Sequence, residues 1–398
     1  MMKNKLFLGL AIVAMLFSCT TDDTADIVIN DNSDNSVVNN TTTGGGGETG
    51  QTIFLSGTYT ENLTLDPINT YKVNGSLIMA SGTTLTVPAG MTIKALATGA
   101  NVYIAISQGA KITANGTANE PIVLTSDASS PAAGDWGGLI ILGKAPINSV
   151  TGTATSTSEI ASLPFGGTDA TDDSGSISYL RVEYSGGAAD GQSENNGLSF
   201  YGVGNGTFVS HVESFEGKDD GFEFFGGTVN ADHIVAINNQ DDSIDWTEGY
   251  TGTITDAYVK HGENHDKGIE ADGYNTDFSN EGSYFSKPTV TNLTIVGLGS
   301  STGNEAIRLR AGTQGIFTNV LIEGFEEGFD LDGDTGDNPT GAGVLSNDLN
   351  VTDVTFTDVT TKLKNDTGEI FNEADFISGD GNGTGTDYLS WGSGWTIE

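Results

Sequence analysis

Carboxylate side chains recur at a regular interval in the middle of this 398-residue chain. Glu223, Asp245 and Glu270 each lie between two apolar residues, in short segments that open with a small residue and are soon followed by glycine. If these segments stack as neighbouring strands, the carboxylates lie about 4.8 Å apart and repel unless they are protonated, paired or bridged by a cation. Calcium takes about 6–8 oxygen ligands, so the pattern predicts a calcium site here.

The acidic column continues toward the C-terminus, where arginines interrupt it. Asp330 occupies the next equivalent position, and Asp332 and Asp334 follow it in a glycine-rich loop that lacks the glycine and glutamate spacing of an EF-hand. We expect these three carboxylates to contribute calcium ligands as well. The alternative is a hydrated acidic face without metal, in which Arg308 and Arg310 neutralise the carboxylates beside them.

The order of acidic, histidine and arginine residues along the repeats also resembles that of polygalacturonase-type glycoside hydrolases, in the runs Asp219-Asp220, Asp241-Asp242, His261…His265 and Arg308-Leu309-Arg310. The resemblance implies catalytic roles, with Asp220, Asp241 and Asp242 as acid and base, His265 tuning them, and Arg308 holding a sugar carboxylate. Two carboxylates one or two coils apart can reach the ~6.5–9.5 Å separation of an inverting enzyme. The family's Gly-His-Gly motif is absent, and Arg310 replaces its lysine.

These side chains belong to a repeated element. Its six copies start 24, 22, 25, 38 and 22 residues apart and alternate apolar with polar residues: Gly197–Phe200, Gly221–Phe224, Ser243–Trp246, Gly268–Ala271, Ala306–Leu309 and Gly328–Leu331. A period of this size marks a solenoid, and the two-residue alternation marks strands with one buried face. We therefore predict an all-β fold, a single-stranded right-handed parallel β-helix of about twelve coils.

A second set of segments repeats between the first with matching steps. It comprises Tyr179–Val182, His211–Glu213, His233–Val235, Tyr258–Lys260, Asn292–Ile295, Asn319–Ile322 and Asp353–Phe356. His211 and His233 occupy equivalent positions and suggest a transition-metal site. A polar ladder at a coil corner explains all seven leading residues, whereas a metal explains only these two, so the ladder is favoured.

The ends of the coil stack need protection. Beyond about residue 366 the pattern changes, and aromatic side chains predict a cap over the last coil: Phe371, Phe376, Tyr388, Trp391 and Trp395. Residues 144–175 are rich in small residues and predict a long loop or lip on one face, whereas Trp136 is expected in the core. With loops 187–195 and 274–288, this lip would wall the cleft that a hydrolase needs.

The N-terminus predicts secretion and lipidation. Residues 1–18 form a signal peptide, and Leu16-Phe17-Ser18-Cys19 resembles the bacterial lipoprotein processing site, which implies acylation of Cys19. Residues 19–50 are expected to be a flexible acidic and glycine-rich tether, and residues 51–398 the β-helix domain. The pair Asp22-Asp23 resembles the surface-export signal of Bacteroidota lipoproteins, which implies an outer-membrane location facing the exterior.

Several runs resemble those of right-handed parallel β-helix surface lipoproteins of marine and environmental bacteria: Asp135–Gly138, Lys218–Asn230, Asp241–Trp246 and Gly394–Thr396. The resemblance implies the fold and the location but no activity. The net charge of −38 excludes nucleic acid as a partner and disfavours anionic membranes. We expect a monomeric binding or scaffold module for a glycan or an outer-membrane receptor; the alternative is a polysaccharide-degrading hydrolase or lyase.

The lipid anchor yields a direct prediction. Cys19→Ala removes the only thiol in the chain that can be acylated, so the variant should leave the membrane fraction and appear in the soluble fraction. Fractionation followed by immunoblotting measures this, with Ser18→Ala as the matched control. Retention of the Cys19→Ala protein in membranes would contradict the anchor.

Overall fold

The computed structural model describes residues 50–148, 154–188, 194–277, 279–333 and 339–398. Almost all regular structure in these residues is β-strand; the helices α1 (Thr340–Leu345), α2 (Glu373–Phe376) and α3 (Tyr388–Trp391) are short. No helix in the described ranges has the length and apolar character needed to cross a bilayer. The predicted signal peptide and Cys19 lie outside the described residues, as does the tether up to residue 49.

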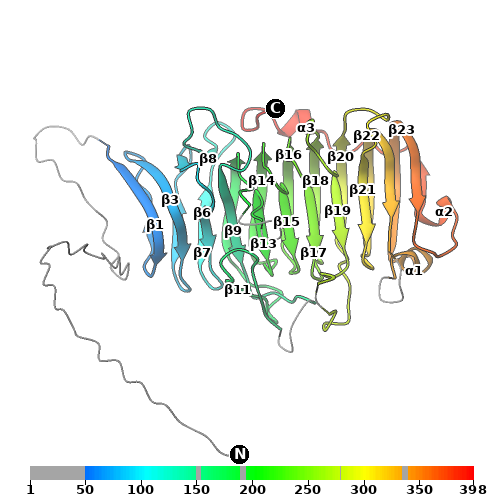
Figure 1. The fold of residues 1–398 in the computed structure, drawn as a ribbon, viewed down its shortest axis with the longest axis horizontal. Coiled ribbons are helices and arrows are strands. Elements are labelled where there is room, and N and C mark those ends of the chain that lie inside the picture. The colour runs from blue at the N-terminus through cyan, green and yellow to red at the C-terminus, as the bar shows by residue number, and fades with distance from the viewer. Residues whose placement is uncertain (1–49, 149–153, 189–193, 278, 334–338) are drawn as a thin grey trace, which may run out of the picture. The chain divides into compact units, whose positions relative to one another are not determined.

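One ladder of parallel strands runs through the β-helix from its first coil to its last (Figure 1). Its members are β1 (Thr52–Tyr59), β3 (Thr70–Met79), β5 (Thr92–Ala95), β8 (Ile122–Ser126), β12 (Gly175–Glu183), β14 (Phe208–Phe215), β16 (Asn230–Ile237), β18 (Thr253–Lys260), β20 (Thr289–Val296), β22 (Gly315–Leu331), β23 (Leu349–Asn365) and β24 (Ile377–Asp380). These twelve strands confirm the predicted number of coils.

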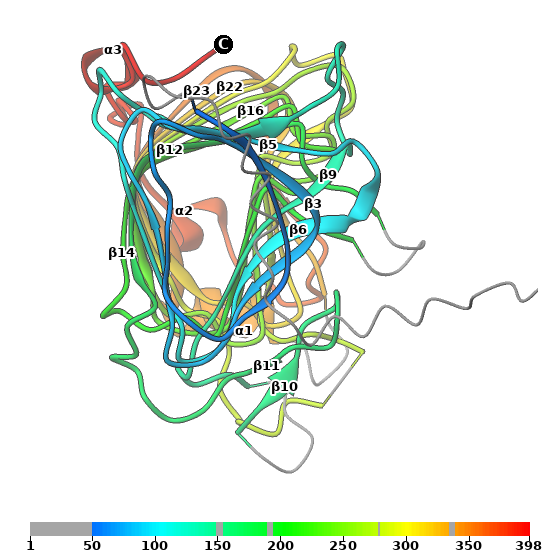
Figure 2. The same ribbon diagram turned by 90° about the vertical axis from the view of Figure 1, so that its left-hand side faces the viewer.

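Two further ladders run around the same axis, one along most of the stack and one through the first coils, as Figure 2 shows along the stack. The longer one comprises β6 (Gly99–Ile106), β9 (Trp136–Leu142), β13 (Leu198–Tyr201), β15 (Phe222–Phe225), β17 (Ile244–Thr247), β19 (Ile269–Asp272) and β21 (Glu305–Arg310), and ends in β22 and β23. The shorter one comprises β2 (Leu63–Thr64), β4 (Thr84–Val87) and β7 (Lys111–Asn115), and joins β12. The separate antiparallel pair β10 (Ser156–Thr157) and β11 (Pro164–Phe165) lies in the predicted lip.

Apolar side chains that point inward stack on their counterparts in the next coil. The rings of Phe200 and Phe224 lie 5.0 Å apart at 10°, and Tyr250 continues the stack 4.5 Å from Phe224. Trp136 is 1% exposed and donates its indole N–H to the carbonyl of Glu183, which confirms its place in the core. Stacking of like residues therefore fills the interior and holds the register of the coils.

A left-handed residue bends most coils at one corner. Seven residues at equivalent positions have φ between 46° and 59°: Tyr179, His211, His233, Asp256, Asn292, Asn319 and Asp353. The structure corrects one member of the predicted column, since Asp256 occupies the corner and Tyr258 pairs with Val235 instead. Aspartate and asparagine tolerate this conformation better than a bulky tyrosine does.

The C-terminal aromatic residues divide between two places, so the predicted single cap over the last coil is not confirmed. Phe376 lies 5.1 Å from Phe329 in the core and covers the last coils from α2. Tyr388, Trp391 and Trp395 instead lie against the corner column in the middle of the stack, with Trp391 4.8 Å from His233. The exposed rings of that column supply the apolar surface against which α3 packs.

The stacked aromatic core predicts that shortening one buried side chain will strongly destabilise the fold. Phe224→Ala removes a fully buried ring between two stacked rings and should cost about 3–5 kcal/mol of unfolding free energy. Phe208→Ala in the adjacent ladder removes a ring that is 57% exposed and is the matched control. Thermal melts followed by circular dichroism compare the two; equal, small shifts would contradict the stacked core.

Candidate functional site

The predicted acidic column exists in register on one outward face. Glu223 pairs with Asp245, Asp245 with Glu270, Glu270 with Arg308, and Arg308 with Asp330 on successive strands. The residues on either side of each member are buried in the core. The alternation read from the sequence is therefore correct at all five positions.

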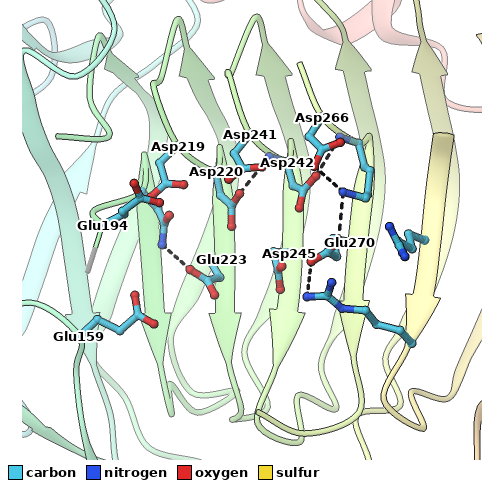
Figure 3. Close-up of a pocket in the computed structure, with 14 residues that line it drawn as sticks. Glu159, Glu194, Asp219, Asp220, Glu223, Asp241, Asp242, Asp245, Asp266 and Glu270 are labelled. Carbon is cyan, nitrogen blue, oxygen red and sulfur yellow. Dashed lines mark hydrogen bonds and ion pairs between the residues drawn. The ribbon is translucent and has the colours of Figure 1, made fainter. Parts of the chain in front are cut away.

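The column members Glu223, Asp245, Glu270 and Arg308 form one wall of a cavity of about 400 Å³ (Figure 3). A second row of acidic residues, on the turns that precede the same strands, forms the adjoining wall, and two loops add further carboxylates. In all, the cavity is lined by ten acidic side chains, Glu159, Glu194, Asp219, Asp220, Glu223, Asp241, Asp242, Asp245, Asp266 and Glu270, together with Asn196, Lys267, Arg308 and Arg310.

The three basic side chains neutralise only one end of the cavity. Lys267 lies 3.1 Å from Glu270 and also pairs with Asp266, and Arg310 pairs with both Glu270 and Asp272. Arg308 donates to Asp332, outside the cavity. The expectation that the arginines compensate the carboxylates beside them is confirmed for this end.

Eight lining carboxylates make no ion pair with any residue in the described ranges: Glu159, Glu194, Asp219, Asp220, Glu223, Asp241, Asp242 and Asp245. A few uncharged donors reach them. Asn196 donates to Glu223 over 2.5 Å, and a backbone N–H donates to one oxygen each of Asp220 and Asp242. Neutral hydrogen bonds leave the negative charge in place, so this group of eight, which we call the unpaired carboxylates, requires protons or cations.

Burial and mutual repulsion both disfavour the charged forms. Burial, with Glu194 and Asp241 nearby, raises the pKa of Asp219 to about 8. Burial and Glu194 likewise raise the pKa of Glu159 to about 7. Desolvation, and then neighbouring carboxylates, hold the pKa values of Asp220 and Asp245 well above their ordinary range. Without a cation, part of the cavity is therefore protonated near neutral pH.

The spacing of the oxygens suits a metal ion. Three such groups are Asp220–Glu223–Asp245, Asp242–Asp245–Glu270 and Glu194–Asp219–Asp241, and in each a carboxylate oxygen from every residue lies within 4.8 Å of the others. A cation bound at about 2.4 Å fits between oxygens separated by that distance or less. The predicted ligands Glu223, Asp245 and Glu270 all belong to these groups.

Two further predicted metal ligands, Asp330 and Asp332, do not line the cavity. Asp330 is 1% exposed and accepts from the Lys364 ammonium at 3.1 Å, and Asp332 accepts from Arg308. Asp334 lies outside the described residues. Asp330 and Asp332 thus have cationic partners of their own, which lowers their need for a metal.

The predicted catalytic residues are brought together only in part. Asp220, Asp241 and Asp242 meet in the cavity, where one carboxylate oxygen of each lies within 4.8 Å of the others. His265 is not among the lining residues, since its ring stacks on His261 at 3.7 Å. Arg308 lines the cavity with its guanidinium engaged by Asp332.

The corner histidines are arranged as a stacked ladder. The rings of His211 and His233 lie 4.4 Å apart and only 5° from parallel. An imidazole binds a metal in the plane of its ring, and the nitrogens of two parallel stacked rings point in nearly the same direction, which disfavours a shared ion. His211, Asp232 and His233 nevertheless offer ligand atoms within 4.8 Å of one another. Ser210 is hydrogen-bonded to Nδ1 of His211 at 2.8 Å, and a carboxylate oxygen of Asp232 lies 2.8 Å from Nδ1 of His233.

The sequence analysis missed Glu159, Glu194 and Lys267. Glu159 comes from the lip, which is anchored where Phe165 packs 4.9 Å from Tyr201 on the outward face. Glu194 comes from the loop before β13, and neither loop residue belongs to the repeat that marked the others. Lys267 carried a usable signal, because it directly precedes a strand where the earlier repeats have aspartate.

The fold and the cavity define a parallel β-helix with an acidic site on one outward strand ladder. Residues 57–396 match the model of the pectate-lyase-like β-helix domain, so the chain belongs to that family. No curated protein matches the chain.

The raised carboxylate pKa values predict that the stability of the fold falls, rather than rises, with increasing pH. In calcium-free buffer, the native state binds protons that the unfolded state has lost, because Asp219 titrates near pH 8 when folded but near about pH 4 when unfolded. The melting temperature should therefore fall from about pH 5 to about pH 8 and change little above that. Calorimetry measures this, and Asp219→Asn should flatten the profile; a wild-type melting temperature that rises with pH would refute it.

Proposed function

We propose that the cavity binds calcium and that the protein is a calcium-dependent binding module held at the cell surface by a lipid on Cys19. The observation that carries the proposal is the set of eight unpaired carboxylates in one cavity of about 400 Å³. Calcium accepts irregular all-oxygen sites at about 2.3–2.6 Å, whereas magnesium demands octahedral geometry at about 2.0–2.1 Å. Oxygens spread up to 4.8 Å apart favour the larger ion.

A binding role fits this site better than catalysis does. Oxygens of Asp220, Asp241 and Asp242 lie within reach of a single cation, and the histidine expected to tune these carboxylates stacks elsewhere. Three protein oxygens fill only part of a calcium coordination sphere. The remaining positions face the cavity, where oxygen atoms of a glycan or of an outer-membrane partner would replace water.

The proposal predicts calcium-dependent stability that two substitutions remove. Wild type should melt several degrees higher in millimolar calcium than in chelator, because calcium binds only the folded carboxylate site. The double variant Glu223→Gln, Asp245→Asn should have a lower melting temperature than wild type in calcium but not in chelator. Differential scanning fluorimetry of residues 51–398 measures both.

The matched control is Glu326→Gln, which removes an exposed carboxylate on β22 outside the cavity. It should behave like wild type in both buffers. Equal shifts of the double variant with and without calcium would show that Glu223 and Asp245 hold no metal.

A further inference from the structure

The charge of the chain is divided unevenly along the stack. Residues 51–148, which supply β1 to β9 and which we call the N-terminal coils, carry four basic and five acidic side chains. Residues 149–398 carry nine basic and 42 acidic side chains. The net charge that disfavours an anionic membrane therefore lies almost wholly beyond the N-terminal coils.

Two lysines of the N-terminal coils lie in register behind an exposed ring. Phe54 on β1, Lys72 on β3 and Lys94 on β5 occupy equivalent outward positions on successive strands. Phe54 is 56% exposed, and both lysines are partly exposed. One carboxylate serves both ammonium groups, since Asp127 lies 2.7 Å from Lys72 and 3.8 Å from Lys94. This column, which we call the N-terminal stripe, is aromatic at its end and has a net positive charge behind the ring.

The first coil ends the stack and leaves further apolar side chains in contact with solvent. Strand β1 lies at one end of the ladder (Figure 1). Ile68 is 42% exposed on the turn before β3, and Ile53 and Tyr59 are only half-buried. An aromatic ring with lysines behind it suits the surface of a bilayer, because the ring favours the boundary with the acyl chains and the ammonium groups favour the phosphates.

The coil spacing keeps the acidic coils away from such a surface. Successive strands lie about 4.8 Å apart, so Lys72 and Lys94 fall about 5 Å and about 10 Å behind Phe54, within reach of lipid headgroups. The fifth coil starts with β12, about 19 Å from β1 along the stack. This distance exceeds the Debye length of about 8 Å at physiological salt, so repulsion from the acidic coils is screened when the first coil meets the bilayer end-on.

The chain enters the fold at the same end. Strand β1 begins at Thr52, and 32 residues separate it from Cys19. With a lipid on Cys19, the first coil is therefore the part of the fold nearest to the bilayer along the chain. A tether of this kind gives an effective concentration in about the millimolar range, so even a weak contact is occupied.

We propose that the first coil rests end-on against the anionic headgroups of the bilayer that carries the Cys19 lipid. Phe54 lies at the interface, and Lys72 and Lys94 lie among the phosphates. The acidic coils, with the cavity among them, are held on the side away from the bilayer and open to a partner. The inference rests on the proposed lipid anchor, to which it adds the docking surface, and it does not depend on calcium.

Two fluorescent reporters test the orientation. Lipidated full-length Phe54→Cys and Phe208→Cys proteins are labelled on the new thiol and reconstituted into phosphatidylcholine vesicles with and without phosphatidylglycerol. Phe54 and Phe208 are 56% and 57% exposed, so the two sites are matched in exposure. With phosphatidylglycerol, quenching by aqueous acrylamide should fall several-fold at position 54 and stay unchanged at position 208. Without it, the protection at position 54 should be smaller.

A pair of substitutions tests the lysines. Lys72→Gln with Lys94→Gln should remove the extra protection that phosphatidylglycerol gives at position 54, since each lysine near an anionic surface favours the docked state roughly fivefold. The matched control is Lys260→Gln with Lys362→Gln, which removes two lysines of 40% exposure outside the N-terminal coils. The control should keep the protection, and thermal melts should show that both variants are folded.

The outcomes separate this inference from the lipid anchor. Protein that does not remain with the vesicles removes the anchor and the docking surface together. Vesicle-bound protein that is quenched equally at positions 54 and 208 overturns the docking surface and leaves the anchor intact. Protection that survives the loss of Lys72 and Lys94, or that is the same without phosphatidylglycerol, overturns recognition of anionic headgroups.

Discussion

The fixed distance between stacked coils is the constraint on which the rest of the structure depends. Because parallel strands repeat about every 4.8 Å, any residue in one coil lies against its equivalent in the next. Inside, this places Phe200 against Phe224 and gives a continuous apolar stack. Outside, the same register places Glu223 against Asp245, where repetition is unfavourable. The same strand repeat therefore produces both the apolar core and the acidic site.

The chain compensates this repulsion at one end of the ladder and leaves it at the other. Toward the C-terminus, arginine replaces the acidic residue in the column, and Arg310 and Lys267 hold Glu270 between them. Lys364 does the same for Asp330. Toward β15 the carboxylates have neither cationic neighbours nor full access to water. The difference between the two ends concentrates uncompensated charge in one small volume.

The strand register was predictable from the sequence because it depends on local alternation. The outward column from Glu223 to Asp330 needed only the two-residue period, which survives any loop length between coils. Glu159 and Glu194 were not predictable, since each reaches the cavity from an irregular loop whose path depends on tertiary packing. The prediction that placed Tyr258 in the corner column was wrong. The corner position is set by the left-handed backbone conformation, which Asp256 adopts, and not by the polarity of the side chain.

The same limit applies to the C-terminal segment. An aromatic cluster after the last repeat indicates a buried surface, but the sequence does not say which one. The C-terminal segment that contains α3 returns along the corner column, where aromatic rings and polar side chains recur in several coils. Local composition therefore indicated that these rings cover an apolar surface. Which surface they cover is decided by packing between residues far apart in the sequence.

This returning segment changes how the solenoid comes apart. Coils of a repeat protein touch only their neighbours, so they can fray one at a time from an end. Here Thr386 bonds to Asp256, Trp395 accepts from Arg181, and the backbone N–H of Ile397 bonds to the buried Glu213. These contacts fasten several central coils to one returning segment, so the opening of one coil disturbs the contacts of the others. The central coils, which hold the acidic cavity, therefore open together or not at all.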